Sequence, residues 1–172
     1  MVKLYAVVVL YKTSYDVRIL KGAYDLQSFG FFERSSVQEF MSFTSKIVTE
    51  RSSVSSRQSV KEQVCVSCVC TSRYLAGVVL DDFSVKVPAH LWASTEASAI
   101  PYNDLPATLA KWQNPREADA LTRVQEEHNT IESILERGEK LDDLVVKSEM
   151  LTMQSKAFYK TARKTNACCN FG

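Results

Sequence analysis

Residues 131–165, IESILERGEKLDDLVVKSEMLTMQSKAFYKTARKT, decide the fold of this chain. Steps of four and three residues on either side of Arg137 select one stripe of mainly apolar or small side chains. Its members are Ile134, Leu141, Leu144, Ser148, Leu151, Ser155, Phe158 and Ala162. Such a seam, held over about four heptads with charges on the other faces, predicts a helix that packs against partner helices.

Arg137 is the one charged member of this seam. A buried arginine costs several kcal/mol unless another group pairs with it, so it more often fixes register and partner choice than adds stability. Spacing alone leaves a second interpretation open, in which Arg137 stands at the exposed end of an ordinary amphipathic helix.

The residues of this motif resemble those of a known protein family. LERGEKLDDLVVKSE, then QSKAFYKTARK and the pair Cys168–Cys169, is similar to the lipid-anchored, longin-domain R-SNAREs. SFGFFERSSVQEFMSFTS and KWQNPREAD in the first two thirds of the chain carry the same resemblance. It implies that Arg137 is the central "zero-layer" residue of a bundle with three Q-SNARE helices: a syntaxin-type Qa helix, a Qb helix and a Qc helix.

The fold expected from the pattern and the resemblance is α+β: an antiparallel longin sheet with flanking helices, then a long SNARE coiled-coil helix. Residues 3–12 and 17–26 alternate as a strand hairpin, and residues 36–51 have helical spacing behind a capping box at Ser36. Residues 59–71 and 74–80 have the composition of further strands, and residues 88–99 that of a loop. Asp104 is expected to cap a short helix over residues 105–112. The expected divisions are 1–113 for the longin domain, 114–165 for the SNARE motif and 166–172 for a lipidation tail.

The tail motif has an internal phase offset. Leu121, Val124, His128, Ile131 and Leu135 form one 3-4 seam, which lies one residue out of step with the downstream seam from Ile134. An offset of one residue turns an apolar stripe by about 100°, which a continuous coiled coil absorbs only by local distortion. Compared with the family, the motif lacks about eight residues here, and the longin part lacks about four turns of its second helix.

Net charge and hydrophobicity limit the functions and the cellular locations that the chain can have. The net charge of +1 gives no basis for nucleic-acid binding. No run of 18 apolar residues predicts a membrane-spanning helix, and the first residues read as a strand rather than a signal peptide. We therefore expect a cytoplasmic chain, and the resemblance implies that it is also peripheral on the cytosolic face of Golgi, ER-derived vesicle and endosomal membranes.

The five cysteines form two groups. Cys65, Cys68 and Cys70 lie in a β-rich stretch without a second C-x-x-C, so we interpret them as packing residues and expect no metal site. The resemblance implies palmitoylation of Cys168 and prenylation of Cys169. However, Asn170 and Gly172 fit a prenylation box poorly, so little prenylation of Cys169 is expected. Two unmodified thiols are the alternative.

The leading functional hypothesis is a vesicle-fusion R-SNARE whose longin domain binds its own tail. Phe43 falls off the main apolar stripe of its helix, so it is a candidate docking residue for the tail or a lipid chain, with core packing as the alternative. A shortened, fusion-impaired regulatory longin protein or splice form is the second hypothesis. No enzyme is expected, since no cysteine has a recognisable acid–base partner, and no cofactor beyond a covalent lipid is expected.

Overall fold

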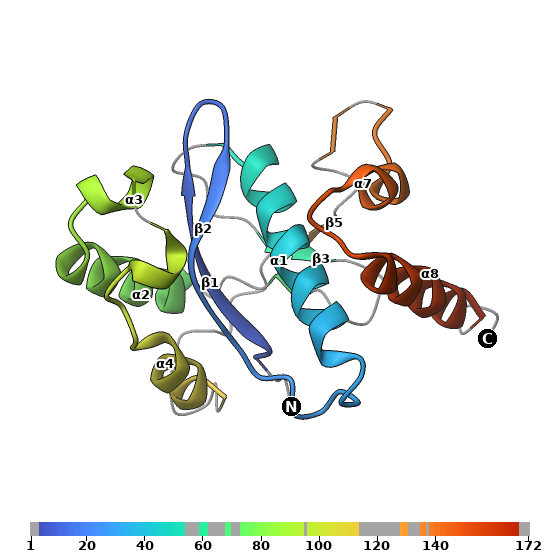
Figure 1. The fold of residues 1–172 in the computed structure, drawn as a ribbon, viewed down its shortest axis with the longest axis horizontal. Coiled ribbons are helices and arrows are strands. Elements are labelled where there is room, and N and C mark those ends of the chain that lie inside the picture. Colours follow the sequence, from blue (N-terminus) through green and yellow to red (C-terminus); the bar gives the residue numbers. More distant parts are fainter. Residues whose placement is uncertain are drawn as a thin grey trace. The chain divides into compact units, whose positions relative to one another are not determined.

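The computed structural model describes residues 4–53, 59–61, 68–69, 73–94, 96–113, 128–130, 135–136 and 138–168. The fold is α+β, as predicted, and its elements in chain order are shown in Figure 1. The chain divides into two compact units, residues 1–25 with 71–126 and residues 26–70 with 127–172. Each unit is described by itself below.

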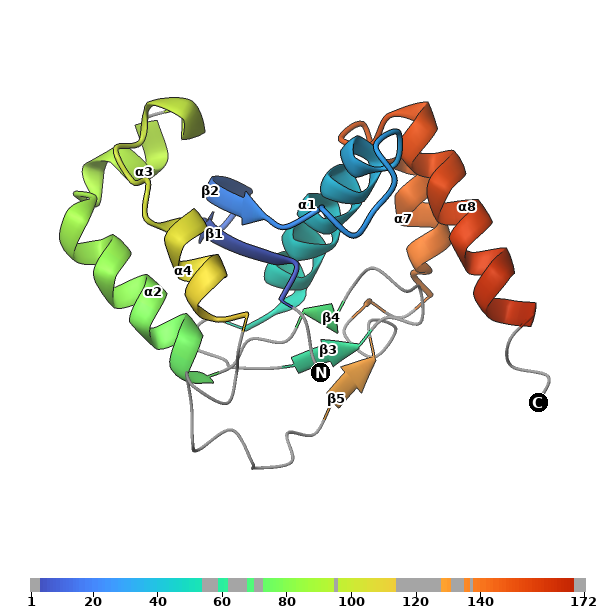
Figure 2. The same cartoon turned by 90° about the horizontal axis from the view of Figure 1, so that it is seen from below.

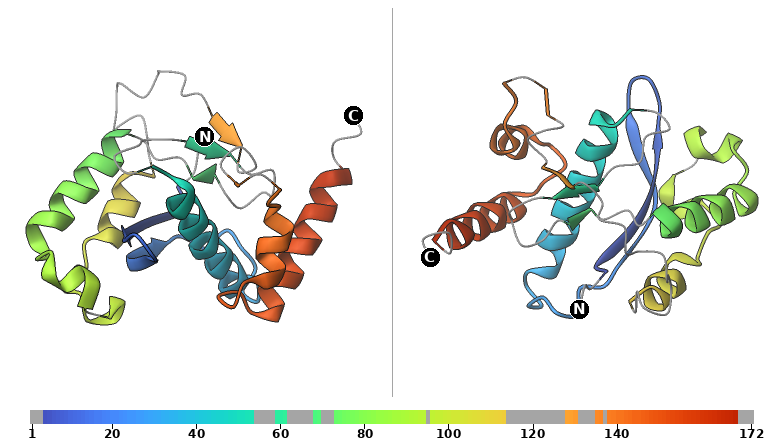
Figure 3. Two further views of the ribbon diagram at one scale, coloured as in Figure 1. Left: turned by 90° about the horizontal axis from the view of Figure 1, so that it is seen from above. Right: turned by 180° about the vertical axis from the view of Figure 1, so that it is seen from behind.

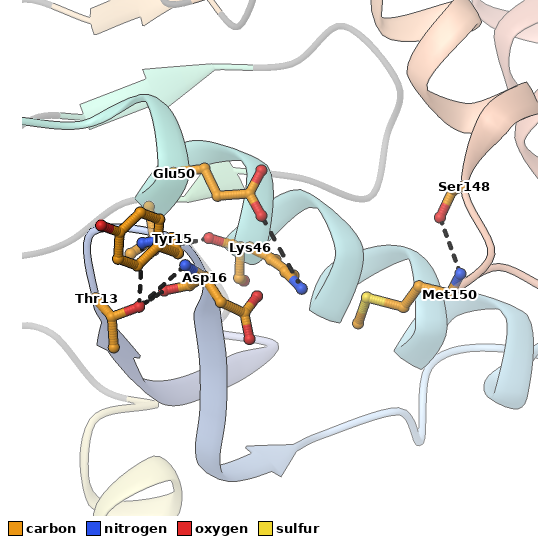
Figure 4. A network of polar contacts seen from close by, with 9 residues as sticks. Thr13, Tyr15, Asp16, Lys46, Glu50, Ser148 and Met150 are labelled. Atoms are coloured by element: carbon orange, nitrogen blue, oxygen red, sulfur yellow. Dashed lines mark hydrogen bonds and ion pairs between the residues drawn. The ribbon is translucent and has the colours of Figure 1, made fainter. Parts of the chain in front are cut away.

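The first unit is built on the hairpin of β1 (Ala6–Lys12) and β2 (Val17–Tyr24). The strands pair antiparallel with a register shift after Val9, and the Thr13 hydroxyl accepts the backbone N–H groups of Tyr15 and Asp16 to close the turn (Figure 4). The predicted hairpin is therefore confirmed, with its turn at the predicted place.

Helix α2 (Arg73–Lys86) corrects the strand predicted over residues 74–80. Valines favoured a strand there. However, Val79, Phe83 and Val87 recur at steps of four and are all buried in the core of the first unit. A helix places these three side chains on one face, so core packing outweighs local strand propensity.

Short helices complete the first unit. The 88–99 stretch, predicted as a loop, contains α3 (His90–Ser94) and the 3-10 helix η1 (Ala97–Ala99). Helix α4 (Leu105–Lys111) follows, and the predicted apolar face of Leu105, Leu109 and Trp112 is buried in the core. Asp104 occupies the N-cap position but makes no side-chain capping bond; it pairs with Lys86 instead, at 2.7 Å.

The second unit contains α1 (Arg34–Arg51), a small sheet and the tail helices, which lie beside α1 in Figures 2 and 3. Helix α1 begins two residues before Ser36, which is buried, so the predicted capping box does not form. In the small sheet, β3 (Ser59–Lys61) pairs antiparallel with β4 (Cys68–Val69) and parallel with β5 (His128–Thr130).

The described part of the tail is divided rather than continuous. It comprises β5, then α7 (Leu141–Lys147) and α8 (Met153–Cys168), with a non-helical connection over residues 148–152. Ser148 is extended, with φ −64° and ψ 127°, and its hydroxyl accepts the N–H of Met150 at 3.2 Å (Figure 4). One long helix without partners leaves its apolar stripe in water, whereas in the divided tail α8 packs on α1 and covers part of that stripe.

Candidate functional site: the surface between α1 and the tail helices

The surface where α8 packs on α1 is the candidate functional site. Among the seam residues of the tail, Leu141 and Leu151 are 5% exposed, and Ser155, which bonds to Glu39 of α1, is fully buried. Leu144, Ser148, Phe158 and Ala162 are half-buried. The residues predicted to face partner helices are thus largely covered by the chain itself.

Glu39 of α1 is the polar centre of this surface. Its Oε2 atom accepts three hydrogen bonds, from Ser155 Oγ at 2.6 Å, Thr152 Oγ1 at 2.9 Å and Thr152 N at 2.9 Å. Burial raises the pKa of Glu39, but these hydrogen bonds outweigh it and hold the pKa below its usual value of 4.5. The charged carboxylate therefore fixes the first turn of α8 against α1.

An aromatic pair supplies the apolar contact beside Glu39. The rings of Phe40 and Tyr159 stack with centroids 5.1 Å apart and planes at 26°. Phe40 is fully buried and Tyr159 is 3% exposed. Stacking of this kind contributes about 0.5–1.5 kcal/mol beyond the burial of area.

Three contacts tie α7 to α8. The Tyr159 hydroxyl donates to Asp142 Oδ1 at 2.9 Å, Arg163 forms an ion pair with the same carboxylate, and Lys156 Nζ donates to the Val146 carbonyl at 2.8 Å. Tyr159 and Asp142 are 17 residues apart, which is about 25 Å along a straight helix. These contacts therefore belong only to the folded-back tail.

Phe43 lies in α1 with its ring centroid 6.3 Å from that of Phe40, and it is 4% exposed. Phe43 is therefore buried, as the core-packing alternative expects, and its docking role stays a prediction. Arg137, Ile134 and Cys169 lie outside the described residues; Cys168 is the last residue of α8. Their predicted roles are not tested by the geometry.

Sequence reasoning missed Glu39, Val145 and Tyr159. Val145, 1% exposed, and Tyr159 each follow a seam residue by four positions, so helical spacing from Leu141 and Ser155 could have found them. Glu39 fits the capping box, and no local signal links it to a partner more than 100 residues away.

No group of three metal-ligating side chains occurs among the residues that the structure describes. Over the same residues, no helix has the length and apolar character needed to cross a bilayer.

Comparisons with known proteins indicate the family of the chain. The synaptobrevin family matches residues 119–169, which include both tail helices. The synaptobrevin homologue ykt6 of Schizosaccharomyces pombe is 39% identical over 97% of this chain and 98% of its own length. The homologues YKT6 of Candida glabrata and Saccharomyces cerevisiae are 41% and 40% identical over 84% of this chain and 85% and 87% of theirs. The chain therefore belongs to the longin-domain R-SNARE family of these synaptobrevin homologues, and it is a SNARE of vesicle trafficking.

Proposed function

We propose that the chain is a vesicle-fusion R-SNARE whose tail alternates between α1 and a Q-SNARE bundle. In the bundle, residues 134–165 form one helix beside a syntaxin-type Qa helix, a Qb helix and a Qc helix. Zippering toward the membrane end draws two membranes together. Arg137 then hydrogen-bonds glutamines of the three partners, which satisfies its buried charge and fixes the register.

One observation carries the regulatory half of this proposal: Ser155, a seam residue, is fully buried and bonded to Glu39. A side chain cannot pack against α1 and inside a bundle at once. Docking on α1 therefore competes with assembly, and the apparent affinity for Q-SNAREs equals the intrinsic affinity multiplied by the fraction of tails that are undocked. This supports autoinhibition by the chain's own longin domain.

Assembly of the bundle requires the docked tail to change its backbone conformation and to lose contacts. The tail must exchange the extended backbone at Ser148 for helix and break the contacts of Asp142 with Tyr159 and Arg163. Each such exposed or half-buried contact is worth about 1 kcal/mol or less, so the docked state resists assembly modestly and partner binding can overcome it.

For membrane attachment we propose acylation of Cys168 supported by Lys156, Lys160, Arg163 and Lys164, with little prenylation of Cys169. Cationic side chains contribute about 1 kcal/mol each near an anionic surface, whereas one lipid chain alone binds a membrane marginally. The sites of action proposed with this anchor are the cytosol and the cytosolic faces of Golgi, ER-derived vesicle and endosomal membranes.

The alternative function is a shortened, fusion-impaired regulatory longin protein or splice form. Two observations favour it. The tail seams are one residue out of phase, and the alignment with the Schizosaccharomyces pombe relative spans 194 positions, 22 more than the 172 residues of this chain. Zippering is then limited to about residues 134–165, with weaker docking of vesicles.

Insertion of eight residues after Glu126 discriminates between these functions. Eight residues bring the two seams into phase, whereas seven residues add the same bulk and keep the offset, which makes the seven-residue insertion the matched control. If the native chain is impaired by its phase, only the eight-residue insertion raises affinity for a Q-SNARE trio. Equal affinity of the native chain and both insertion variants would indicate that the native chain is fully active without inserted residues.

Arg137→Ala tests the zero-layer role in the bundle. We expect little change in the free chain, and a bundle weaker by about 1–3 kcal/mol with relaxed partner choice, because the partner glutamines lose their hydrogen bonds. Arg34→Ala, which removes an arginine at the exposed start of α1, is the control. Unchanged affinity and specificity of Arg137→Ala for the Q-SNARE trio would contradict this role.

A further inference from the structure

A tight turn precedes α7 in the docked tail. The N–H of Glu139 donates to the Glu136 carbonyl at 2.9 Å, and Glu139 Oε2 accepts the N–H of Glu136 at 2.9 Å. Between them, Gly138 has a φ of 90°, far from the helical value of about −63°. The docked backbone is therefore not helical at this point, next in sequence to Arg137.

Arg51, the last residue of α1, holds this turn from outside. Its Nε atom donates to Glu139 Oε2 at 3.2 Å, its Nη2 atom donates to Glu139 Oε1, and its Nη1 atom lies 3.6 Å from Glu136 Oε1. The side chains of Arg51 and Glu139 are each 23% exposed. A two-pronged, partly buried contact of this kind fixes geometry better than a single surface ion pair.

We propose that Arg51 and Gly138 are the positioning residues that keep the tail's central turn out of the helical state. Arg51 clamps Glu139, and Gly138 is the hinge at which the docked turn converts into the continuous helix of the bundle. The proposal rests on the proposed function for its purpose, but the clamp and the hinge are properties of the free chain and can be tested there.

The role of Gly138 follows from its backbone rather than from crowding. A Cβ atom placed on it meets nothing within 4 Å, so alanine fits sterically. Yet residues with a Cβ, asparagine and aspartate apart, are disfavoured in the left-handed region by about 1–2 kcal/mol, and alanine favours a helix. Gly138→Ala therefore disfavours the docked turn and favours the assembled helix, while Gly138→Asn tolerates positive φ.

Hydrogen exchange of the full-length free chain measures how Gly138 substitutions change the docking of the tail, with residues 153–164 of α8 as the readout. We expect Gly138→Ala to speed their exchange about fivefold to thirtyfold, from the cost above. Gly138→Asn should change it less than about threefold. Gly77→Ala, at a glycine of α2 with equally open surroundings, is the control and should leave α8 unchanged. Equal rates for the alanine and asparagine variants overturn the hinge.

The clamp is tested by charge exchange. Arg51→Glu and Glu139→Arg should each speed α8 exchange by about fivefold or more. The double variant should lose less protection than the two single effects combined, because the ion pair re-forms in reverse although the side chain at position 139 no longer accepts the Glu136 N–H. Arg34→Glu, at the other end of α1, is the control. A loss of protection in the double variant equal to the two single effects combined overturns the clamp, since residues that do not pair with each other predict additive losses of free energy.

A second readout separates this inference from the proposed function. Gly138→Ala should also increase the rate of assembly with a soluble Q-SNARE trio. If α8 exchange changes as expected but no variant assembles, the clamp and hinge stand and the R-SNARE proposal fails. If assembly occurs normally while α8 exchange is insensitive to all these variants, the inference fails and the R-SNARE proposal stands.

Discussion

Ser155 Oγ donates a 2.6 Å hydrogen bond to Glu39 Oε2, which joins a fully buried residue of the predicted bundle seam to the second turn of α1. The two residues are 116 positions apart in the chain. Small size lets Ser155 sit at the contact between the helices, and its hydroxyl needs an acceptor because it is buried. Glu39 supplies that acceptor only while the tail is docked.

Replacing Glu39 should release the tail. Glu39→Ala leaves the Ser155 hydroxyl and the Thr152 N–H without their acceptor, at a cost of about 1–3 kcal/mol to docking. Hydrogen exchange of α8 in the full chain should therefore accelerate by about one order of magnitude, while that of β1 and β2 stays constant. Glu33→Ala is the control, because the Glu33 carboxylate accepts the N–H of nearby Gly30, three residues away. Equal protection of α8 in both variants would show that Glu39 does not hold the tail.

Docking should weaken in acid. The pKa of Glu39 is raised by burial and lowered more by its hydrogen bonds, for a net decrease from 4.5. The bond to the Glu136 backbone and the pairing with Arg51 likewise lower the pKa of Glu139, against the effect of burial. A group with a lowered pKa in the docked state contributes fully above its ordinary pKa, and its contribution disappears as pH falls through the lower value.

The docked fraction should therefore be constant from pH 7 to about 5 and fall below about 4.5. Energy transfer between dyes on non-canonical residues at Gln38 and Ala157, both exposed, follows it without touching the native cysteines. Glu39→Gln should flatten part of this pH dependence. A docked fraction that instead rises in acid would reverse the sign argued here.

Two substitutions of Tyr159 distinguish the contribution of ring stacking to docking from that of hydrogen bonding. Tyr159→Phe keeps the ring on Phe40 and loses the bond of the hydroxyl to Asp142, so docking should weaken by about 1 kcal/mol. Tyr159→Ala removes the ring as well and should cost about 3–5 kcal/mol. Exchange rates of residues 141–147 report both. Phe158→Ala, at the half-buried neighbouring position, is the comparison and should cost less than Tyr159→Ala.

Membrane attachment should depend on Cys168. Cys168→Ser is expected to move most of the chain into the soluble fraction of eukaryotic cells, whereas Cys169→Ser should have a small effect, because Asn170 and Gly172 suit prenylation poorly. Intact-mass measurement identifies the attached group. A farnesyl or geranylgeranyl mass on Cys169 would overturn this assignment.

Local patterns predicted much of this molecule and missed what depends on distant partners. The hairpin and the apolar face of Leu105, Leu109 and Trp112 follow from alternation and helical spacing, which the structure keeps. The helical state of residues 74–80 was missed because Val79 is a β-branched residue whose helical partners, Phe83 and Val87, lie beyond the predicted strand.

The candidate site was predictable only in part. Leu141, Leu151 and Ser155 of the predicted seam are buried in the free chain, but a heptad pattern does not state which surface buries them, and their packing in a bundle stays a prediction. A sequence optimised for a bundle predicts one helix, and the bends at Gly138 and Ser148 belong to the docked state, in which the chain must cover its own stripe. A single periodicity in the sequence does not distinguish two states in which the same residues pack against different surfaces.

The central claim is that α1 and the Q-SNARE bundle compete for the same face of the tail. Energy transfer between dyes at Gln38 and Ala157 in the full-length chain measures this during addition of a soluble Q-SNARE trio. The account predicts high transfer in the free chain, a fall that tracks bundle formation, and a faster fall for Glu39→Ala. Bundle formation with unchanged high transfer would show that the tail contacts α1 and the Q-SNARE helices at the same time, which contradicts the account.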